Sequence, residues 1–373
     1  MNKKNVVIII LESYSREFFG SLNKDIKGGQ YKGFTPFLDS LIGESLVFPK
    51  SFANGRKSID AMPSIIASIP SLVYPYVISE NSTNKINSLA TILKKEGYTT
   101  SFFHGAPNGS MGFSAFAKTA GVEKYYGKNE FGNDAFFDGM WGIWDEEFFQ
   151  FYAQELNQMK EPFYSSIFSV SSHHPFVVPE RYEGKFPEGD LPVCKVIGYT
   201  DFALRRYFDT VKTMPWYKNT IFVITADHST LPLFEDYSTT ANSFAIPLIF
   251  FTPDSSMRGV NYKTASQIDI MPTLLDKMHY KGTFSAFGKS LLDTTNTGSS
   301  MTYINEDYQL IRNDTSVLFD GKKCVGAYDL AHDKFEKNNL VGKVNLNSYE
   351  TYIKAFMQQY NNRMLEDKLV PGR

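Results

Sequence analysis

Apolar residues along the chain fall into short runs that alternate with longer amphipathic stretches. The first run, residues 5–11, is apolar almost throughout, which is typical of a central parallel strand covered on both faces. Similar runs predict four further strands, at residues 99–104, 163–169, 220–225 and 246–251. Helical periodicity and end signals predict the intervening helices, at residues 35–43, 59–69, 88–97, 145–159, 197–213 and 268–277. This alternation favours an α/β fold with a mostly parallel central sheet flanked by helices.

The pattern changes after about residue 296. Closely spaced short runs, joined by Asn-Asp and Asp-Gly turn signals, predict a small antiparallel sheet at residues 301–304, 308–312, 315–319 and 324–329. A final helix is predicted at residues 348–363. We therefore expect a large α/β domain at residues 1–296 and a C-terminal α+β subdomain at residues 297–373.

The charge composition of the chain limits the kinds of molecule that it can bind. The chain has 38 basic and 40 acidic side chains among 373 residues, so its formal charge of −2 creates no general attraction for nucleic acid. An anionic substrate must then be held by local charges or by a metal. Cys194 and Cys324 could pair only if the fold brings them together. No protein partner is indicated.

The chain also lacks an apolar stretch of membrane-spanning length, since its longest such run covers only residues 6–11. Its first strand begins within a few residues of Met1. That abrupt start is expected of a domain cut from a longer protein, although a cytoplasmic protein could begin in the same way.

Candidate chemistry lies directly after predicted strands, because ligands of open parallel sheets bind beyond the carboxyl ends of the strands. Glu12 follows the first strand and Asp227-His228 follows the fourth. A carboxylate there is costly to desolvate unless it is paired or binds a metal. Either acid alone could equally cap a helix or form a structural ion pair. Two such placements in one sheet favour a shared metal, Mn²⁺ or Zn²⁺, with Mg²⁺ as a further possibility.

Ser58 stands at the start of a predicted helix, after Arg56 and Lys57. Helix N-termini and cations both favour an anionic group, and a metal can activate a serine hydroxyl for attack on phosphorus. The alternative, favoured when Ser58 is considered alone, is a helix N-cap.

Two histidines, His173 and His174, follow the third predicted strand. One of these imidazoles could protonate a leaving alkoxide or bind a phosphate oxygen. The alternative is a loop histidine that hydrogen-bonds the backbone.

Taken together, the motifs resemble the alkaline phosphatase superfamily. Within it they are most similar to the branch of lipoteichoic acid synthase and related phosphoglycerol or phosphoethanolamine transferases, whose domain is termed a sulfatase domain. The resemblance covers residues 5 to about 292. It rests on an ordered series of motifs, namely Val-Val-Ile-Ile-Ile-Leu-Glu-Ser, Ser-Phe-Ala-Asn-Gly-Arg-Lys-Ser, Phe-Phe-His-Gly, Trp-Gly-Ile-Trp-Asp-Glu, Ser-Ser-His-His-Pro-Phe, Thr-Ala-Asp-His, Gln-Ile-Asp-Ile-Met-Pro-Thr and Phe-Gly-Lys-Ser-Leu-Leu.

The resemblance implies one divalent metal, Mn²⁺ as first choice, and a serine nucleophile. The implied metal ligands are Glu12, Ser58, Asp227 and His228. Substrate contacts are implied for His173, which we also assign to catalysis, and for His104 and Lys57. Arg56 and His174, their neighbours, complete the set of substrate-binding candidates.

Two departures from the family pattern bear on the substrate. The glycerol-phosphate pocket of lipoteichoic acid synthase uses an acid, a tryptophan and an arginine, where this chain has Ala106, Met111 and Phe113. A different head group is therefore expected. True sulfatases carry Pro two residues and Arg four residues after the modified residue, whereas Asp60 and Met62 follow Ser58. This argues against sulfate-ester hydrolysis.

We predict phosphoryl transfer through a phospho-serine, from a phosphodiester that is lipid-derived by resemblance, to an alcohol or to water. The resemblance also implies an extracytoplasmic catalytic domain, held near a bacterial membrane by a segment outside this sequence. The alternatives are a soluble phosphodiesterase or phosphatase of the same superfamily, and a non-catalytic binding module that retains the fold.

Overall fold

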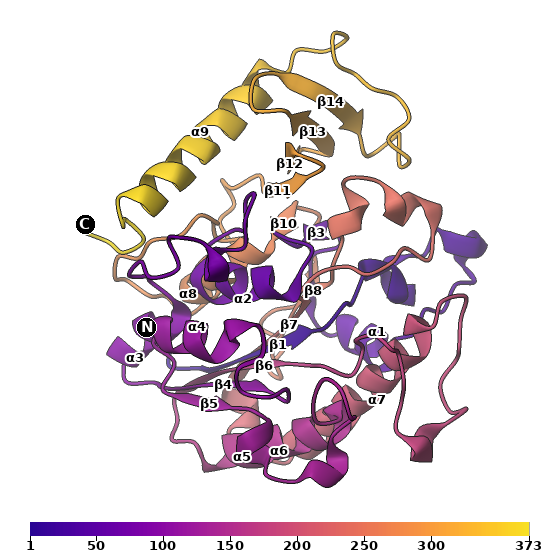
Figure 1. The fold of residues 1–373 in the computed structure, drawn as a ribbon, viewed down its shortest axis with the longest axis vertical. Coiled ribbons are helices and arrows are strands. Elements are labelled where there is room, and N and C mark those ends of the chain that lie inside the picture. The colour runs from indigo at the N-terminus through magenta and orange to yellow at the C-terminus, as the bar shows by residue number, and fades with distance from the viewer. Residues whose placement is uncertain (373) are drawn as a thin grey trace.

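A computed structural model, which describes residues 1–372, places an eight-stranded sheet at the centre of the molecule (Figure 1). The strand order is β5-β4-β6-β1-β7-β8-β2-β9. The strands are β1 (Asn5–Leu11), β2 (Leu46–Val47), β4 (Thr99–His104), β5 (Lys124–Tyr126), β6 (Phe163–Phe168), β7 (Thr220–Ala226), β8 (Leu248–Phe251) and β9 (Gly259–Val260). Neighbours are parallel from β5 to β7, and β8 runs antiparallel to both β7 and β2. The predicted mostly parallel sheet is confirmed.

Helices cover both faces of this sheet, and the central strand shows why. Val6, Ile8 and Ile10 of β1 point into one core, and the alternate residues Val7 and Ile9 point into the other. All are 0% exposed, and each such burial contributes about 1.5–3 kcal/mol. The helices on the first face are α2 (Ser58–Ala67), α3 (Leu89–Lys95), α4 (Phe113–Thr119) and α8 (Ile270–Lys277). The second face carries α1 (Pro36–Ile42), α6 (Asp145–Gln158) and α7 (Val193–Val211), with the short α5 (Lys128–Phe131) nearby.

The C-terminal part forms the predicted antiparallel sheet and helix. Its elements are β11 (Ser300–Ile304), β12 (Asp307–Arg312), β13 (Thr315–Phe319), β14 (Cys324–Asp329) and α9 (Asn347–Leu365). Leu310 and Val317 pack on Ile353 of α9, whereas Ile311 packs on Phe244 of the large domain. The small sheet therefore buries both faces, and the proposed division at residue 296 stays a prediction.

Two very short strands, β3 (Ser51–Phe52) and β10 (Ala265–Ser266), pair in parallel beside the main sheet. They have only two residues each, so hydrophobic periodicity in the sequence could not predict them. They bring the chain before Ser58 next to the chain before α8.

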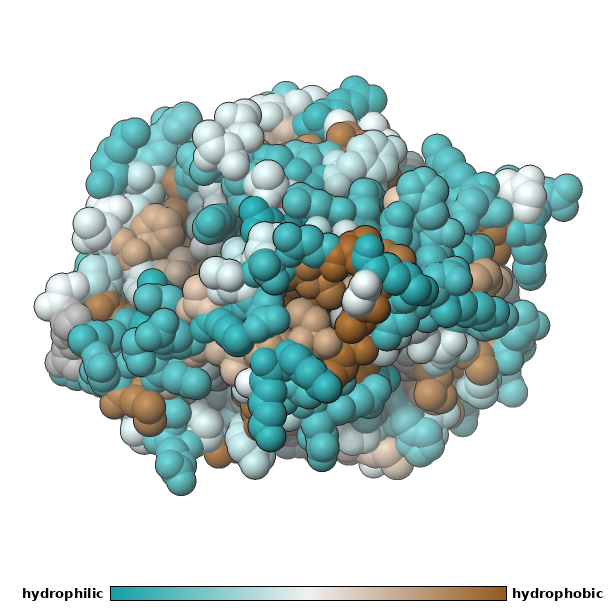
Figure 2. Space-filling model, turned by 90° about the horizontal axis from the view of Figure 1, so that it is seen from above, coloured by the Kyte–Doolittle hydropathy of each residue, from teal (hydrophilic) through white to brown (hydrophobic). Residues whose placement is uncertain are grey.

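The upper face of the molecule, which carries the C-terminal elements, is mostly hydrophilic, with an apolar patch near its centre (Figure 2). Val341 and Val344, between β14 and α9, are exposed. Within the described part of the chain, no helix is both long enough and apolar enough to span a bilayer. The buried Cys194 and the half-buried Cys324 are both free thiols.

Candidate metal centre and nucleophile

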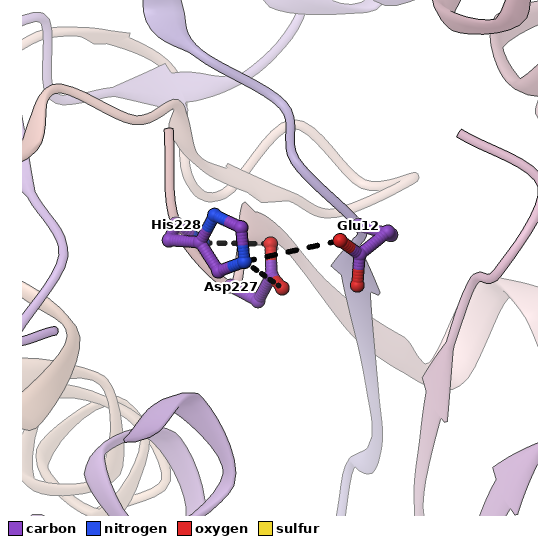
Figure 3. Close-up of side chains that lie close together, drawn as sticks. All are labelled: Glu12, Asp227 and His228. Carbon is purple, nitrogen blue, oxygen red and sulfur yellow. Dashed lines mark hydrogen bonds and ion pairs between the residues drawn. The ribbon is translucent and has the colours of Figure 1, made fainter. Parts of the chain in front are cut away.

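Glu12 and Asp227 lie side by side because the strands that precede them are neighbours. Leu11 of β1 and Ala226 of β7 are paired in parallel register, so the next residue of each chain emerges at the same edge. Figure 3 shows the Glu12 carboxylate directed toward Asp227 and His228. The side-by-side placement expected of strand-end residues is thus realised.

Hydrogen bonds fix one oxygen of Asp227 and leave the other facing the site. Oδ1 accepts the backbone N–H of Ser13 at 2.7 Å and that of His228 at 2.6 Å. Oδ2 is buried and has no hydrogen-bond partner among the described residues, although it lies 3.1 Å from His228 Nε2. Glu12 Oε1 lies 3.8 Å from the same nitrogen and accepts the Ser13 hydroxyl at 2.8 Å.

Ser58 completes this cluster from the start of α2. Its hydroxyl donates to Glu12 Oε2 at 3.1 Å and lies 3.4 Å from His228 Nε2. The N-cap position belongs to Lys57, whose backbone N–H donates to Asp60 Oδ2 at 3.2 Å. Ser58 is therefore the first helical residue, and its side chain faces the acids instead of capping the helix.

The electrostatics of the cluster favour a bound cation. Burial acts to raise the pKa of Glu12, but the charges of His228 and His173, together with side-chain hydrogen bonding, lower that pKa below its ordinary value. Burial and the neighbouring Glu12 carboxylate raise the pKa of Asp227 well above its ordinary value. The pKa of His228 is raised by the two acids despite burial, which acts to lower it. Two adjacent buried carboxyls that resist joint ionisation form a site that a divalent cation would neutralise.

The donor set fits a divalent metal. Ligand atoms of Glu12, Asp227 and His228 lie within 4.8 Å of one another, and the free Oδ2 of Asp227 is a ready ligand. Two carboxylates, one imidazole and a hydroxyl form a mixed oxygen and nitrogen set that suits Mn²⁺ or Zn²⁺.

Two serines after β6 hold the main chain of Glu12 in place. The backbone N–H of Glu12 donates to Ser169 Oγ at 2.9 Å, and Ser172 Oγ donates to the Glu12 carbonyl at 2.5 Å. Sequence reasoning assigned them no role, although they stand in the same Ser-Val-Ser-Ser-His-His stretch as His173.

His173 is held by a residue that the sequence analysis did not single out. Its ring lies against the indole of Trp141, with a centroid separation of 3.6 Å and a tilt of 34°. The Trp141 indole N–H donates to the carbonyl of His174. Asp138 Oδ1 accepts three backbone N–H groups of this loop, from Met140, Trp141 and Gly142. The side chain of His174 is exposed, and no contact joins it to the metal-ligand candidates.

His104 lies deeper than a substrate contact needs to. It is 5% exposed and packs on Phe113 and Phe168, with ring centroids 5.0 and 5.3 Å away. Burial lowers its pKa to about 4, and its Nδ1 has no hydrogen-bond partner in the described chain. Phe113 is 0% exposed and belongs to the core of the large domain.

Arg56 and Lys57 are exposed cations that directly precede Ser58 in the chain. Within residues 1–372 their side chains form no hydrogen bond or ion pair. They line a cavity of about 240 Å³ together with Tyr74 and Tyr303. Gly55 precedes them because a Cβ atom there would lie 2.2 Å from Asp60 Oδ2. The loop thus offers two exposed positive charges next to Ser58, of which that of Lys57 also acts to lower the pKa of Asp60, which burial raises.

Comparison with known proteins identifies the family. Residues 4–280 match the sulfatase family. The chain belongs to the sulfatase family. It has the alkaline phosphatase superfamily fold, and it is an enzyme of the sulfatase family.

Among curated relatives, lipoteichoic acid synthase 1 of Bacillus subtilis is 27% identical over 352 residues, covering 86% of this chain and 53% of the relative. Lipoteichoic acid synthase of Staphylococcus aureus is 28% identical over 308 residues, covering 73% of this chain and 45% of the relative. The chain therefore spans about half the length of these relatives.

Solved structures share the fold. A protein of the alkaline phosphatase superfamily from Vibrio parahaemolyticus superimposes with a TM-score of 0.79 at 24% identity, covering 96% of this chain and 88% of that one. A lipoteichoic acid synthase from Listeria monocytogenes gives a TM-score of 0.71 at 22% identity, with coverages of 97% and 93%. At these identities the likeness establishes the architecture alone.

Proposed function

We propose that this protein transfers a phosphoryl group from a phosphodiester through a phosphorylated Ser58, with one divalent metal, preferably Mn²⁺, held by Glu12, Ser58, Asp227 and His228. One observation carries the proposal. The Ser58 hydroxyl lies 3.1 Å from a Glu12 oxygen and 3.4 Å from His228 Nε2, beside the unpaired Oδ2 of Asp227. When bound, such a cation lowers the pKa of the serine hydroxyl and offsets charge on the phosphoryl oxygens.

The chain's own groups supply the remaining steps. Ser58 Oγ reacts as the alkoxide, its proton having passed to solvent; it attacks phosphorus, the bond from phosphorus to the leaving oxygen breaks, and His173 gives that oxygen a proton. An acceptor alcohol or water then attacks phospho-Ser58 and returns a proton to His173, and the bond from phosphorus to Ser58 Oγ breaks to release the Ser58 alkoxide. Trp141 orients His173, and Arg56 with Lys57 attracts the anionic substrate. His174, which is exposed, is proposed as an outer substrate contact, whereas the substrate contact expected of the buried His104 stays a prediction.

The donor and its place in the cell are inferred from the relatives. Their names describe synthesis of lipoteichoic acid, which supports a lipid-derived phosphodiester such as a phosphoglycerol lipid for this chain. We place the domain on the extracytoplasmic side of a bacterial membrane, near the lipid through a segment outside this sequence. Residues 1–296 would form the catalytic domain and residues 297–373 its attached subdomain.

Sulfate esters are not the proposed substrate, despite the family's name. Asp60 and Met62 stand where formylglycine formation requires Pro and Arg, and Asp60 is instead committed to the backbone of Lys57. A soluble phosphodiesterase, with water as its only acceptor, would use the same residues.

The test is hydrolysis of an aryl phosphodiester, an aryl phosphomonoester and an aryl sulfate, with added Mn²⁺ or with a chelator. We expect diester turnover that needs the metal and falls at least about 10³-fold in Ser58→Ala. Ser64→Ala is the matched control, since Ser64 is a buried serine of the same helix that bonds only to backbone carbonyls. A phosphoryl group trapped on Ser58 should be detected by mass spectrometry.

Three outcomes would contradict the proposal. Sulfate turnover would reverse the substrate class, and activity unchanged in Ser58→Ala would remove the nucleophile. Absence of activity on every ester, together with absence of metal binding, would favour a non-catalytic binding module.

A further inference from the structure

Two buried amide side chains connect the loop that carries Ser58 to the strand that carries Asp227. Gln267 is 1% exposed, and its Nε2 donates to the carbonyls of Ala226 and Asp227 at 2.8 and 2.7 Å. Its Oε1 accepts the backbone N–H of Asn54 at 2.9 Å. One amide group therefore touches both halves of the candidate site.

Asn54 extends this connection in two further directions. It is 0% exposed, and its Oδ1 accepts the Ser266 hydroxyl at 2.8 Å and the Ile268 N–H at 3.2 Å. Its Nδ2 donates to the carbonyl of Met301, in β11 of the C-terminal sheet, at 3.0 Å. Every polar atom of this side chain is thus used.

The two amides meet because the short strands β3 and β10 are paired. Phe52 of β3 lies opposite Ser266 of β10, so Asn54 and Gln267 emerge together just beyond the ends of these strands. Ser58 follows Asn54 after a single turn of loop and then enters α2. The spacing between Asn54 and Gln267 therefore limits where Ser58 can stand.

The backbone carbonyls at the end of β7 need hydrogen-bond donors from outside the sheet. The pairing of β7 with the antiparallel β8 ends at Thr225 and Leu248, so Ala226 and Asp227 lie beyond the last rung. Both residues are 0% exposed, and buried carbonyls without partners are destabilising. The Gln267 amide supplies the two donors that β8 no longer offers.

We propose that Gln267 and Asn54 are positioning residues that fix the Ser58 loop against the metal-ligand strand, an inference that rests on the proposed function for its catalytic readouts. Neither side chain is among the metal-ligand candidates. They hold the main chain at Asp227 on one side and at Asn54 on the other, so the distance from Ser58 Oγ to the ligand oxygens follows from their geometry. Outer partners of this kind typically change metal affinity or activity by about 10–100-fold when they are removed.

The test compares Gln267→Met with Gln309→Met. Gln309 is also 0% exposed, and its amide lies 3.0 Å from the hydroxyls of Thr240, Thr302 and Ser316, away from the candidate site. Both changes remove a buried amide at similar volume. In Gln267→Met we expect kcat for an aryl phosphodiester to fall at least about tenfold and the Kd for Mn²⁺ to rise at least about tenfold, with KM within about threefold. In the control we expect all three to stay within about twofold of wild type.

Hydrogen exchange provides a readout that does not depend on activity. We expect backbone amides in residues 53–60 and in residues 224–230 to exchange at least about tenfold faster in Gln267→Met, because both segments lose one shared anchor. In Gln309→Met neither segment should change. An inactive, metal-free wild type would refute the proposed function, while this measurement would still decide the positioning role.

A second pair of variants, with smaller changes, controls for the possibility that the glutamine variants fail to fold. Ser266→Ala removes a single hydrogen bond to Asn54 Oδ1, and Ser316→Ala removes a comparable one to Gln309. We expect kcat to fall about threefold in the first and to stay at the wild-type value in the second. Equal effects in Gln267→Met and Gln309→Met, or in the two serine variants, would overturn the inference.

Discussion

The strand-end residues and the rim residues of the candidate site differ in how the fold holds them. Asp227, Glu12 and Ser58 are 0%, 3% and 5% exposed, and each is hydrogen-bonded across neighbouring elements. Arg56 and Lys57 are exposed, and within the described residues no hydrogen bond or ion pair holds their side chains. Under the proposed function, the difference separates the reacting groups, which the strand ends and α2 fix in place, from the exposed loop cations, which attract the substrate. The following variants test this division, from the largest expected effect to the smallest.

Asp227→Asn should nearly abolish the reaction without harming the fold. We expect kcat to fall at least about 10³-fold, equivalent to about 4 kcal/mol, because a carboxylate ligand is lost. The amide can still accept from Ser13 and His228, and its new N–H can donate to His228 Nε2, 3.1 Å away. Thermal unfolding in chelator should therefore occur at or above the wild-type temperature, since a buried carboxyl is removed.

The control for this variant is the response to metal. Added Mn²⁺ should raise the unfolding temperature of the wild type and leave that of Asp227→Asn unchanged. Equal metal-dependent stabilisation of both proteins would show that Asp227 is not a ligand.

His104 should behave as a core residue in its effect on stability. Burial lowers its pKa from 6.5 to about 4, so the unfolded chain takes up this proton first as the pH falls. Its contribution is complete above pH 6.5 and is lost progressively down to about pH 4. This difference corresponds to at most about 3 kcal/mol.

The measurement is urea unfolding of wild type and His104→Phe in chelator at about pH 7 and about pH 4. We expect the unfolding free energy of the wild type to fall more over this interval than that of the variant. The same pH dependence in both proteins would indicate that the His104 ring is exposed to solvent, where it could contact the substrate.

Trp141 should show an intermediate effect, because it supports a rim histidine. Trp141→Ala removes both the ring against His173 and the N–H bonded to the His174 carbonyl, and we expect kcat to fall about tenfold. Trp141→Phe keeps a ring and should lose about twofold. Trp144→Phe, which alters an indole in contact with Tyr199, serves as control. A fall in Trp144→Phe as large as that in Trp141→Ala would indicate a general packing effect.

The smallest effect is expected for the exposed cations. In the double variant Arg56→Ala and Lys57→Ala, we expect KM for an anionic diester to rise about three- to tenfold, with kcat within about twofold. The rise should shrink as salt is added, because exposed charges are screened. Replacement of Lys322 and Lys323, exposed in the β13–β14 turn, should leave KM unchanged. A loss of kcat instead of KM would place these side chains among the reacting groups.

The sequence allowed the long elements to be predicted because their apolar residues are the ones that form the two cores. The apolar run of β1 contributes to both cores, and the periodic apolar residues of α6 and α7 contribute to one of them. It did not reveal β3 and β10, or β2 and β9, because two residues carry no period. It also did not show that β8 runs antiparallel, because an apolar strand looks the same in either direction.

At the candidate site, the strand-end rule placed Glu12 beside Asp227 correctly, because parallel strands end at one edge. The position of Ser58 in the helix could not be predicted from the neighbouring sequence, because an N-cap serine and a serine at the first helical position are only one residue apart. Trp141, Asn54 and Gln267 stand in motifs that carry the family resemblance, but their roles escaped prediction for another reason. Their contacts join segments that are far apart in sequence, and no local pattern records them.

The strand β1 is apolar on both faces, and this has a consequence for insertions and deletions. In a sheet with one solvent-exposed face, loss of one residue would turn the apolar side chains toward water and destabilise the fold. In β1 every residue from Val6 to Leu11 is buried whichever face it takes. A deletion in β1 would exchange the side chains of the two cores and withdraw Glu12 by about 3.3 Å from Asp227, so core packing and the candidate metal site would be lost together.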